Sequence, residues 1–365
     1  MPPKGKADTA GYQQLKKDLS AQAPGKLYIL HGEETYLRDY CLNQLKELIL
    51  SGGMGTFNFH EIPAKEMSPR RLEEALDCLP MMAQRTLVQV TDFDLFKAGE
   101  KDREAYAKLF EELPDYVCLV FVYDLIPYKG DARTKLAGAI KRSGVVVNFA
   151  RQETGELVKW VRRRFRALGK DIDGNLASEL IFLCGDLMTN LIGEIEKIGA
   201  YAKGAQITRA DIDAVATPQL DTVVFRMTDA IGAGKFDQAA QVLGELFQMQ
   251  EPPIKILSVL GRQLRQLYSA RLALEGRKGT GYLVELWGLR SAYPAQKLID
   301  AARRYDLGWC RMAVSEAARA DLAMKSVAGA DGEELLIELL LKLANTPPKA
   351  EDRQTPQGVP YRRTR

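Results

Sequence analysis

The sequence LYILHGEETYL, residues 27–37, joins an uninterrupted apolar run to the beginning of a segment with helical spacing. Residues 27–30 show no polar alternation, which is typical of a strand covered on both faces of a parallel sheet. The apolar residues that follow recur at the spacing of one buried helix face; they are Leu37, Tyr40, Cys41, Leu45 and Leu48. The stretch therefore predicts a buried strand, a short turn and an amphipathic helix.

Similar apolar runs recur further along the chain and alternate with helix-like stretches. The additional predicted strands are residues 57–62, 86–90, 117–123 and 145–149. The predicted helices are residues 35–50, 68–79, 101–113 and 131–141. Because neighbouring parallel strands need helical crossover connections, this alternation predicts an α/β domain with a parallel sheet over residues 1–150.

After this domain the strand signal ends and only helical spacing remains. Apolar residues at helical spacing predict helices over residues 157–168, 174–183 and 187–201. A short connection around Pro218 follows them. We therefore expect a small three-helix domain over residues 151–217.

The remainder of the chain predicts a larger helical domain and a tail. Residues 218–345 keep helical spacing throughout, and prolines, which are expensive inside a helix, separate the helices; these are Pro218, Pro252, Pro253 and Pro294. Residues 346–365 are rich in proline and charge but poor in apolar residues. Such a composition predicts a disordered basic tail.

Composition suits a multidomain globular protein. Of the 365 residues, 46% are apolar and 27% are charged. The last twenty residues carry five cations against two carboxylates, which matches the whole net charge of +3. A near-neutral body argues against a protein that coats nucleic acid. The sequence contains no apolar run of about eighteen residues or more and no apolar segment behind its N-terminus, so we expect a cytoplasmic protein with no membrane contact.

Cysteine and histidine usage argues against metal and disulfide chemistry. The five cysteines are far apart, no two of them form a Cys-x-x-Cys pair, and only His31 and His60 could join them at a zinc site. We expect buried free thiols, because unpaired cysteine is among the residues most often buried. No metal and no other cofactor is predicted.

The sequence contains none of the common catalytic motifs. A phosphate-binding loop of the form G-x-x-x-x-G-K-[ST] is absent, and the turn after the first strand carries Glu33 and Glu34, which would repel a triphosphate. A nucleophilic Ser or Cys would have to use one of the two histidines, and no G-x-S-x-G turn is present. We therefore expect a non-catalytic protein, while an ATPase with a degenerate phosphate loop remains an alternative.

A second turn suggests an interaction site. The sequence LPMMAQR, residues 79–85, lies between a predicted helix and a predicted strand. Adjacent Met81 and Met82 cannot both face one core, Pro80 favours an exposed turn, and unbranched thioethers adapt to grooves on partner surfaces. The same residues also fit a turn in which one methionine caps the core and the other is incidental.

Arginines cluster on two predicted helices of the C-terminal half. One helix carries Arg162, Arg163, Arg164 and Arg166, and another carries Arg262, Arg265 and Arg271. Either face could contact phosphates without sequence specificity, in a salt-sensitive manner. A solvated helix face explains the same pattern.

Several of these segments, taken in order, resemble one known family. They are residues 27–37, residues 79–88, GDL at 185–187 before EIEKI at 194–198, VF at 224–225 with DAI at 229–231, EPP at 251–253, and residues 256–267. Together they extend from about residue 25 to residue 344. In this order and spacing, the chain is similar to the delta subunit of the bacterial DNA polymerase III clamp loader.

The resemblance implies a fold and a role. It implies an AAA+-like domain with a RecA-like parallel sheet, a small helical lid domain and an all-helical collar that packs against the other loader subunits. It also implies a replication protein that binds no ATP, while sister ATPase subunits hydrolyse it and a delta prime subunit completes the hetero-oligomer. Such a subunit binds the ring-shaped sliding clamp (beta) and stabilises its open form, so that primed DNA can enter. As part of the polymerase III holoenzyme, it would be classed with DNA-directed DNA polymerase.

The resemblance also places site residues on this sequence. The family's clamp-contacting pair falls on Met81 and Met82, with Leu79 and Pro80 shaping the turn and Arg85 matching a basic residue after the pair. The family usually has Leu followed by Phe at these positions, so Met-Met departs from the family's pattern. The departure concerns the depth and strength of the pocket contact and not its location. Arg85 could bond a clamp carboxylate or a local backbone carbonyl.

Handling DNA would require basic contacts as well. The candidates for contact with DNA are Arg162, Arg163, Arg166, Arg262 and Arg265. A sequence-independent DNA-binding adaptor remains the other alternative, and it predicts strong, salt-sensitive DNA binding without clamp or loader.

Overall fold

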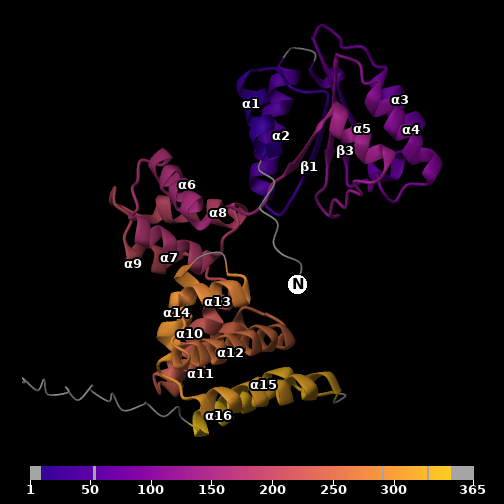
Figure 1. Ribbon diagram of the computed structural model, residues 1–365. Coiled ribbons are helices and arrows are strands. Elements are labelled where there is room, and N and C mark those ends of the chain that lie inside the picture. The colour runs from indigo at the N-terminus through magenta and orange to yellow at the C-terminus, as the bar shows by residue number, and fades with distance from the viewer. Residues whose placement is uncertain (1–9, 52–54, 290–291, 327–328, 347–365) are drawn as a thin grey trace, which may run out of the picture. The chain divides into compact units, whose positions relative to one another are not determined.

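The computed structural model describes residues 10–51, 55–289, 292–326 and 329–346. The chain divides into two compact units (Figure 1). The first ends at residue 152 and also includes residues 187–189, whereas the second holds the other residues from 153 onward.

The first unit is built on a five-stranded sheet in which every neighbouring pair is parallel. The strands are β1 (Leu27–His31), β2 (Phe59–Pro63), β3 (Thr86–Thr91), β4 (Val117–Val122) and β5 (Val145–Asn148), in the order β2-β3-β4-β1-β5. All six residues of β4 are buried, as its unbroken apolar sequence predicts. The predicted α/β class is confirmed.

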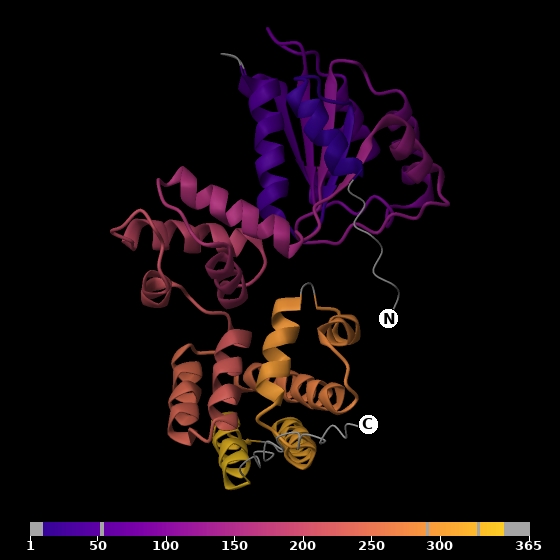
Figure 2. The same cartoon turned by 60° about the vertical axis from the view of Figure 1, so that its left-hand side comes forward.

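Helices cover both faces of this sheet (Figure 2). Leu27 and Ile29 belong to one apolar core, while Tyr28 and Leu30 belong to the core on the other face, because successive strand side chains alternate. Residues of α3 (Pro69–Leu76), α4 (Glu100–Glu111) and α5 (Lys135–Ser143) line the first core. Residues of α1 (Ala10–Ser20) and α2 (Thr35–Leu50) line the second. The sheet is therefore a central layer between two helical layers.

Short elements lead into and out of the edge strand β2. The 3-10 helix η1 (Gly55–Asn58) precedes β2, and η2 (Ala64–Glu66) follows it. Among the described strands, β2 pairs with β3 alone, with Phe59 opposite Leu87 and Ile62 opposite Val90. Because the pair is parallel, the segments that enter β2 and β3 lie at the same edge of the sheet.

Four helices follow the first 152 residues. They are α6 (Thr154–Ala167), α7 (Gly174–Cys184), α8 (Met188–Tyr201) and α9 (Arg209–Val215). The first two residues of α8 belong to the first unit. The apolar spacing predicts the first three but not α9, which is only seven residues long. A capping box begins α9, in which Thr208 and Asp211 each bond the other's backbone N–H.

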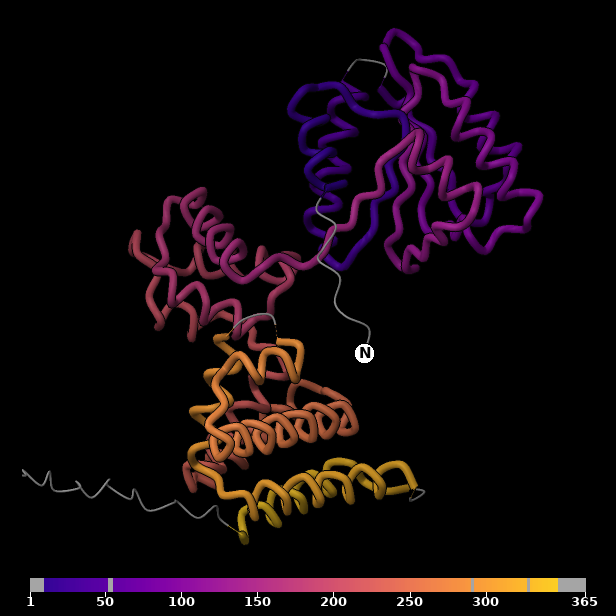
Figure 3. The backbone as a smooth tube through the Cα atoms, in the orientation of Figure 1, coloured from indigo at the N-terminus to yellow at the C-terminus, as the bar shows by residue number. Residues whose placement is uncertain are grey.

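Seven helices complete the described part of the second unit. They are α10 (Leu220–Gly232), α11 (Phe236–Gln248), α12 (Pro253–Glu275), α13 (Thr280–Trp287), α14 (Ala292–Ala302), α15 (Leu307–Ser326) and α16 (Gly332–Asn345). One apolar core draws on all of them, and α15 and α16 lie side by side (Figure 3). Pro253 occupies the first turn of α12, where a missing backbone N–H is harmless. The predicted all-helical C-terminal region is confirmed; of the predicted tail, residues 347–365 lie outside the described residues.

Within the described ranges, no single helix is both long and apolar enough to cross a membrane. Helices α7 and α8 pass that test only when taken together, across a bend of 118°. Both contribute buried side chains to the second unit, among them Leu180, Leu191 and Ile195.

Candidate protein-interaction site

The turn between α3 and β3 exposes three large apolar side chains. Leu79 is 71% exposed, Met81 52% and Met82 90%. The turn begins where α3 ends at Leu76, after the helix has buried Leu72 and Leu76. The structure therefore places neither methionine in the core, and Leu79, Met81 and Met82 all lie on the same short turn.

Buried groups hold the backbone of this turn. The side chain of Asn58 is almost fully buried; its Nδ2 donates to the carbonyl oxygen of Met81 over 3.0 Å, and its Oδ1 accepts from the Met81 N–H over 2.6 Å. The hydroxyl of buried Thr86 donates to the Cys78 carbonyl over 3.1 Å. Turn residues 78–82 are thus fixed at two points while their apolar side chains remain in water.

The most exposed methionine also has an unusual backbone conformation. Met82 has a φ of +50°, in the left-handed region that side-chain-bearing residues rarely adopt. Such a residue typically costs about 1–3 kcal/mol and persists only where neighbouring contacts enforce it. The two bonds from Asn58 to the preceding residue provide such contacts.

Arg85 contacts the local backbone. Its Nη1 donates to the carbonyl of Pro24 over 2.5 Å and to that of Gly25 over 3.3 Å. These bonds connect the beginning of β3 to the segment before β1. The sequence leaves two kinds of partner open for Arg85, a clamp carboxylate and a local backbone carbonyl. The structure shows Arg85 bonded to backbone carbonyls.

Sequence reasoning missed Asn58. Its amide bonds both backbone groups of Met81, yet it lies 23 residues before that residue. A lone Asn among aromatic residues in the sequence FNFH, residues 57–60, carries no signal of that contact. Only the pairing of β2 with β3 brings the two segments together.

The candidate DNA-contacting arginines lie on two helices, and several are engaged within the protein. On α6, Arg162 donates to the carbonyl of Ile172 over 3.1 Å, and Arg166 pairs with Asp171 over 3.3 Å. On α12, Arg262 pairs with Asp221. Of the five candidates, Arg163 on α6 and Arg265 on α12 are exposed and form no ion pair with the described residues.

At the carboxyl edge of the sheet, the chain's own donors engage the acidic side chains. Glu34 is fully buried, and its Oε1 accepts from the backbone N–H of Met188 over 3.0 Å. Glu33 pairs with Arg151 over 2.6 Å. Buried Arg38 pairs with Asp124 over 2.7 Å. These carboxylates occupy the edge at which open α/β sheets usually bind ligands, and their negative charge opposes phosphate binding there.

Aromatic rings pack beside these carboxylates. The ring of His31, at the end of β1, lies 4.9 Å from that of Tyr128, centroid to centroid, and Tyr128 contacts Tyr123 at 5.1 Å. Burial lowers the pKa of His31 below its ordinary value of 6.5. His31 is therefore a packed neutral ring at neutral pH.

The four buried thiols offer no reactive site. Cys41, Cys118, Cys184 and Cys310 are buried free thiols, as predicted, and only Cys78 is partly exposed. Burial raises the pKa of Cys41 to about 11 and that of Cys118 to about 12, so neither forms a thiolate near neutral pH. Across the described ranges, no cluster of three His, Cys, Asp or Glu residues could hold a metal ion.

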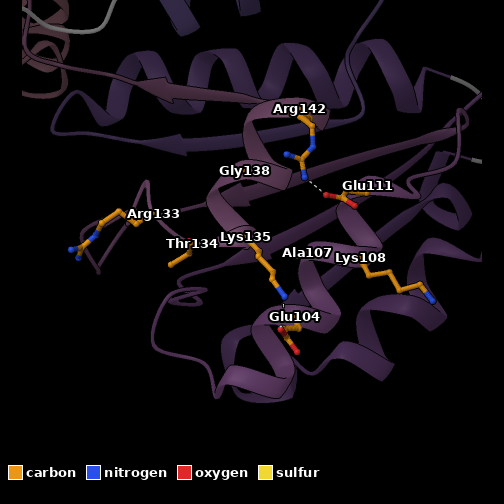
Figure 4. Close-up of a pocket in the computed structure, with 9 residues that line it drawn as sticks. All are labelled: Glu104, Ala107, Lys108, Glu111, Arg133, Thr134, Lys135, Gly138 and Arg142. Atoms are coloured by element: carbon orange, nitrogen blue, oxygen red, sulfur yellow. Dashed lines mark hydrogen bonds and ion pairs between the residues drawn. The ribbon is translucent and has the colours of Figure 1, made fainter.

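A groove of about 610 Å³ lies between α4 and α5 (Figure 4). Its charged side chains are largely paired: Lys135 points toward Glu104, with a nitrogen–oxygen distance of 3.0 Å, and Arg142 points toward Glu111. These pairs connect the two helices and neutralise one another. The groove therefore resembles a helix–helix seam more than a ligand site.

The chain is similar to known proteins over most of its length. A family described as "DNA polymerase III, delta subunit" matches residues 28–150, and one described as the C-terminal domain of the same subunit matches residues 221–343. The DNA polymerase III subunit delta of Bacillus subtilis is 24% identical over 322 residues, covering 86% of this chain and 91% of that protein. The probable subunit delta of Aquifex aeolicus is 23% identical over 299 residues, covering 80% and 83%.

The fold is similar to that of a solved structure. The Bacillus subtilis DNA clamp loader delta protein superimposes with a TM-score of 0.57 and 22% identity, covering 92% of this chain and 99% of that one. The similarity spans both compact units of the described chain.

Proposed function

The chain belongs to the delta subunit family of the DNA polymerase III clamp loader, and on that premise we propose that it binds the sliding clamp through the turn at residues 79–82 and stabilises the open ring. The observation that carries the proposal is the exposure of Leu79, Met81 and Met82 on a turn that buried side chains hold in place. Exposed apolar side chains on a fixed backbone are typical of a protein-binding anchor.

The size of the contact suits a strong but reversible interaction. Burial of the Met81 and Met82 side chains in a partner pocket would contribute roughly 3–6 kcal/mol, at about 1.5–3 kcal/mol each, before the cost of association. Because both side chains are at least half exposed in the free chain, most of that area is available for binding. Arg85 acts in this proposal by fixing the beginning of β3, since its guanidinium already bonds two backbone carbonyls.

The mechanism that we propose is differential binding. A subunit that prefers the open ring shifts the ring's equilibrium by the ratio of its affinities for the open and closed forms, and by no more. The chain itself needs no bound nucleotide for this. The engagement of Glu34 with a backbone N–H and the ion pair of Glu33 support that role, because neither is arranged to receive phosphates.

We assign the remaining parts by the same reasoning. Residues 1–150 contact the clamp, residues 151–217 form the lid, and residues 218–345 form the collar that joins the ATPase subunits and delta prime. Those ATPase subunits would expose or hide the turn in response to ATP. Arg163 and Arg265 are the strongest of the DNA-contact candidates, because Arg162, Arg166 and Arg262 already bond groups of the chain.

Clamp affinity tests the proposed contact. The purified chain is titrated with its own organism's sliding clamp, and the double variant Met81→Ala/Met82→Ala is compared with Leu125→Ala. Leu125 is a matched control, because it is 86% exposed, close to the 90% of Met82, but follows β4 at the opposite edge of the sheet. We expect tight binding by the wild type and Leu125→Ala and loss of binding by the double variant.

Two results would contradict the proposal. Tight binding that survives the double substitution would move the contact elsewhere. An absence of wild-type binding well above micromolar clamp concentration would contradict the proposal and favour the alternative of a DNA-binding adaptor. Circular dichroism of every variant controls for folding.

A further inference from the structure

The turn at residues 79–82 does not determine its own shape. Its central residue, Met81, has both backbone groups bonded to a side chain of another segment, the amide of Asn58 at the end of η1. We propose that η1 is the second half of the clamp-contacting surface, with Asn58 as a positioning residue for the methionines and Phe57 as a fourth apolar contact. This inference rests on the proposed function.

The chemistry of the contact requires a carboxamide. Asn58 donates through Nδ2 to the Met81 carbonyl and accepts through Oδ1 from the Met81 N–H, at 3.0 and 2.6 Å. A carboxylate could accept but not donate, and an apolar residue could do neither. With only 1% of Asn58 exposed, water cannot replace the amide without reorganising the site.

The bonds from Asn58 to Met81 stabilise a backbone conformation that the turn would not otherwise keep. Met82, next in the chain, has a φ of +50°. Since a residue with a side chain prefers negative φ, removing the hold on Met81 should release Met82 into more favourable conformations. A released turn would have to be ordered again on binding, which weakens affinity without removing any contact.

Phe57 extends the apolar surface from the same segment. It directly precedes Asn58 and is 59% exposed, which is high for a phenylalanine. η1 enters β2 and the turn enters β3, and these strands pair in parallel, so both segments lie at one edge of the sheet. Phe57, Leu79, Met81 and Met82 therefore converge there from two segments. A single exposed apolar residue is ordinary, but four large ones at one edge indicate a binding surface.

Matched variants separate positioning from simple folding effects. Asn58→Ala should weaken clamp binding by about 5- to 30-fold, the factor that corresponds to ordering one backbone residue again. Asn58→Asp keeps the acceptor for the Met81 N–H but sets a buried carboxylate oxygen against the Met81 carbonyl, so it should weaken binding at least as much as Asn58→Ala. Gln84→Ala, an exposed site on the same turn, is the control and should leave affinity unchanged.

The contact assigned to Phe57 has its own pair of variants. Phe57→Ala should weaken binding roughly tenfold through lost apolar burial. Tyr40→Ala on α2 removes a ring of similar exposure, 53% against 59%, and should have no effect on affinity. Loss of clamp affinity in both variants alike would show that ring removal acts through folding, and would overturn the role of Phe57.

Two further readouts identify positioning by Asn58. The clamp affinities of the wild type, Asn58→Ala, Met82→Ala and the double variant form a double-mutant cycle. The loss of clamp affinity caused by Asn58→Ala should shrink to less than about twofold when Met82 is already alanine. In the free chain, deuterium exchange of the Met81 amide should accelerate at least about tenfold in Asn58→Ala, while Gln84→Ala exchanges like the wild type.

The outcomes distinguish this inference from the proposed function. Wild-type clamp affinity in both Asn58→Ala and Phe57→Ala would overturn the inference while leaving the turn as the contact. An additive cycle would reduce Asn58 to a structural residue and overturn its positioning role. A wild-type chain that binds no clamp would overturn the proposed function and the partner assigned here, whereas the exchange experiment would still show whether Asn58 holds the turn.

Discussion

At the scale of single residues, one carboxylate shapes the loop after β4. The Oδ1 atom of Asp92 accepts from the backbone N–H groups of Asp124, Leu125 and Ile126 over 2.8, 2.8 and 3.3 Å. Asp92 itself has a φ of +55°, a left-handed conformation that Asn and Asp tolerate better than most residues. Its residue type therefore matters both for the bonds and for the backbone.

Substitution of Asp92 should separate these two contributions. We expect Asp92→Ala to lower the free energy of unfolding by about 1–3 kcal/mol, because three donors lose a charged acceptor and alanine disfavours positive φ. Asp92→Asn should cost less, since its side-chain oxygen still accepts and asparagine tolerates this φ. Urea unfolding followed by far-ultraviolet circular dichroism measures both variants. Equal losses for Ala and Asn would show that the carbonyl oxygen contributes nothing.

The two histidines should make the chain sensitive to mild acid. Burial lowers the pKa of His31, and burial together with the charge of Arg71 lowers the pKa of His60. Between the folded-state pKa and about 6.5, the unfolded chain binds a proton that the folded chain does not, so stability rises with pH in that window. We therefore expect the free energy of unfolding to fall as pH decreases from 7 toward 5.

A substitution at His31 isolates its share of this effect. His31→Phe keeps a ring against Tyr128 but cannot titrate, so the loss of stability between pH 7 and pH 5 should become smaller. Urea titrations at several pH values provide the measurement, with His60→Gln as the companion variant. An unchanged pH dependence in His31→Phe would show that His31 titrates alike in folded and unfolded chains.

The sequence predicts some residues of the site but not the contacts that hold them. Met81 and Met82 are adjacent, and Pro80 precedes them, so exposure follows from local chain geometry. The sequence does not predict the hydrogen-bond partner of Arg85, because a backbone carbonyl and a carboxylate on another protein are both good acceptors. The sequence does not predict the role of Asn58 for a different reason: its contact with Met81 joins segments that meet only when β2 pairs with β3.

At the scale of elements, α1 shows a close backbone contact that apolar spacing does not reveal. The helix is mostly polar and buries only Gly11 and Leu15. It packs on β5 so closely that a Cβ at Gly11 would lie 2.0 Å from the carbonyl oxygen of Val146. α1 contributes only a short apolar stripe, Tyr12, Leu15 and Leu19, to its core, whereas β4, buried along its whole length, is evident from its sequence.

This packing predicts that replacing Gly11 with alanine destabilises the chain, although alanine normally stabilises a helix. Alanine is the better helix former by about 1 kcal/mol, yet Gly11→Ala should destabilise the chain by about 1–3 kcal/mol, because α1 must move away from β5. Gly138→Ala in α5 of the same unit is the control: its Cβ would meet only the flexible end of Arg142, at 3.3 Å. That variant should be neutral or slightly stabilised.

Thermal unfolding followed by circular dichroism measures both glycine variants. A stabilised Gly11→Ala chain would contradict the close packing of α1 on β5. A protease that cleaves within residues 10–20 more readily in Gly11→Ala than in the wild type would localise the effect to α1.

At the scale of the whole molecule, the two compact units carry different surface features. The α/β unit carries the exposed turn, and the helical unit carries the candidate DNA-contacting arginines and a large apolar core drawn from α10–α16. Three of those five arginines bond groups within the chain, and the net charge of the whole sequence is only +3. We therefore expect DNA to be held by the assembly more than by this chain alone.

Ring opening by the chain alone tests the central claim most directly. A sliding clamp carrying a donor and an acceptor fluorophore across one subunit interface is mixed with the purified chain in the absence of ATP. We expect energy transfer to fall saturably with wild-type chain and with Leu125→Ala, and to stay unchanged with Met81→Ala/Met82→Ala. Binding of the wild-type chain with no change in energy transfer would contradict the claim, because the chain would then hold the clamp without preferring its open form.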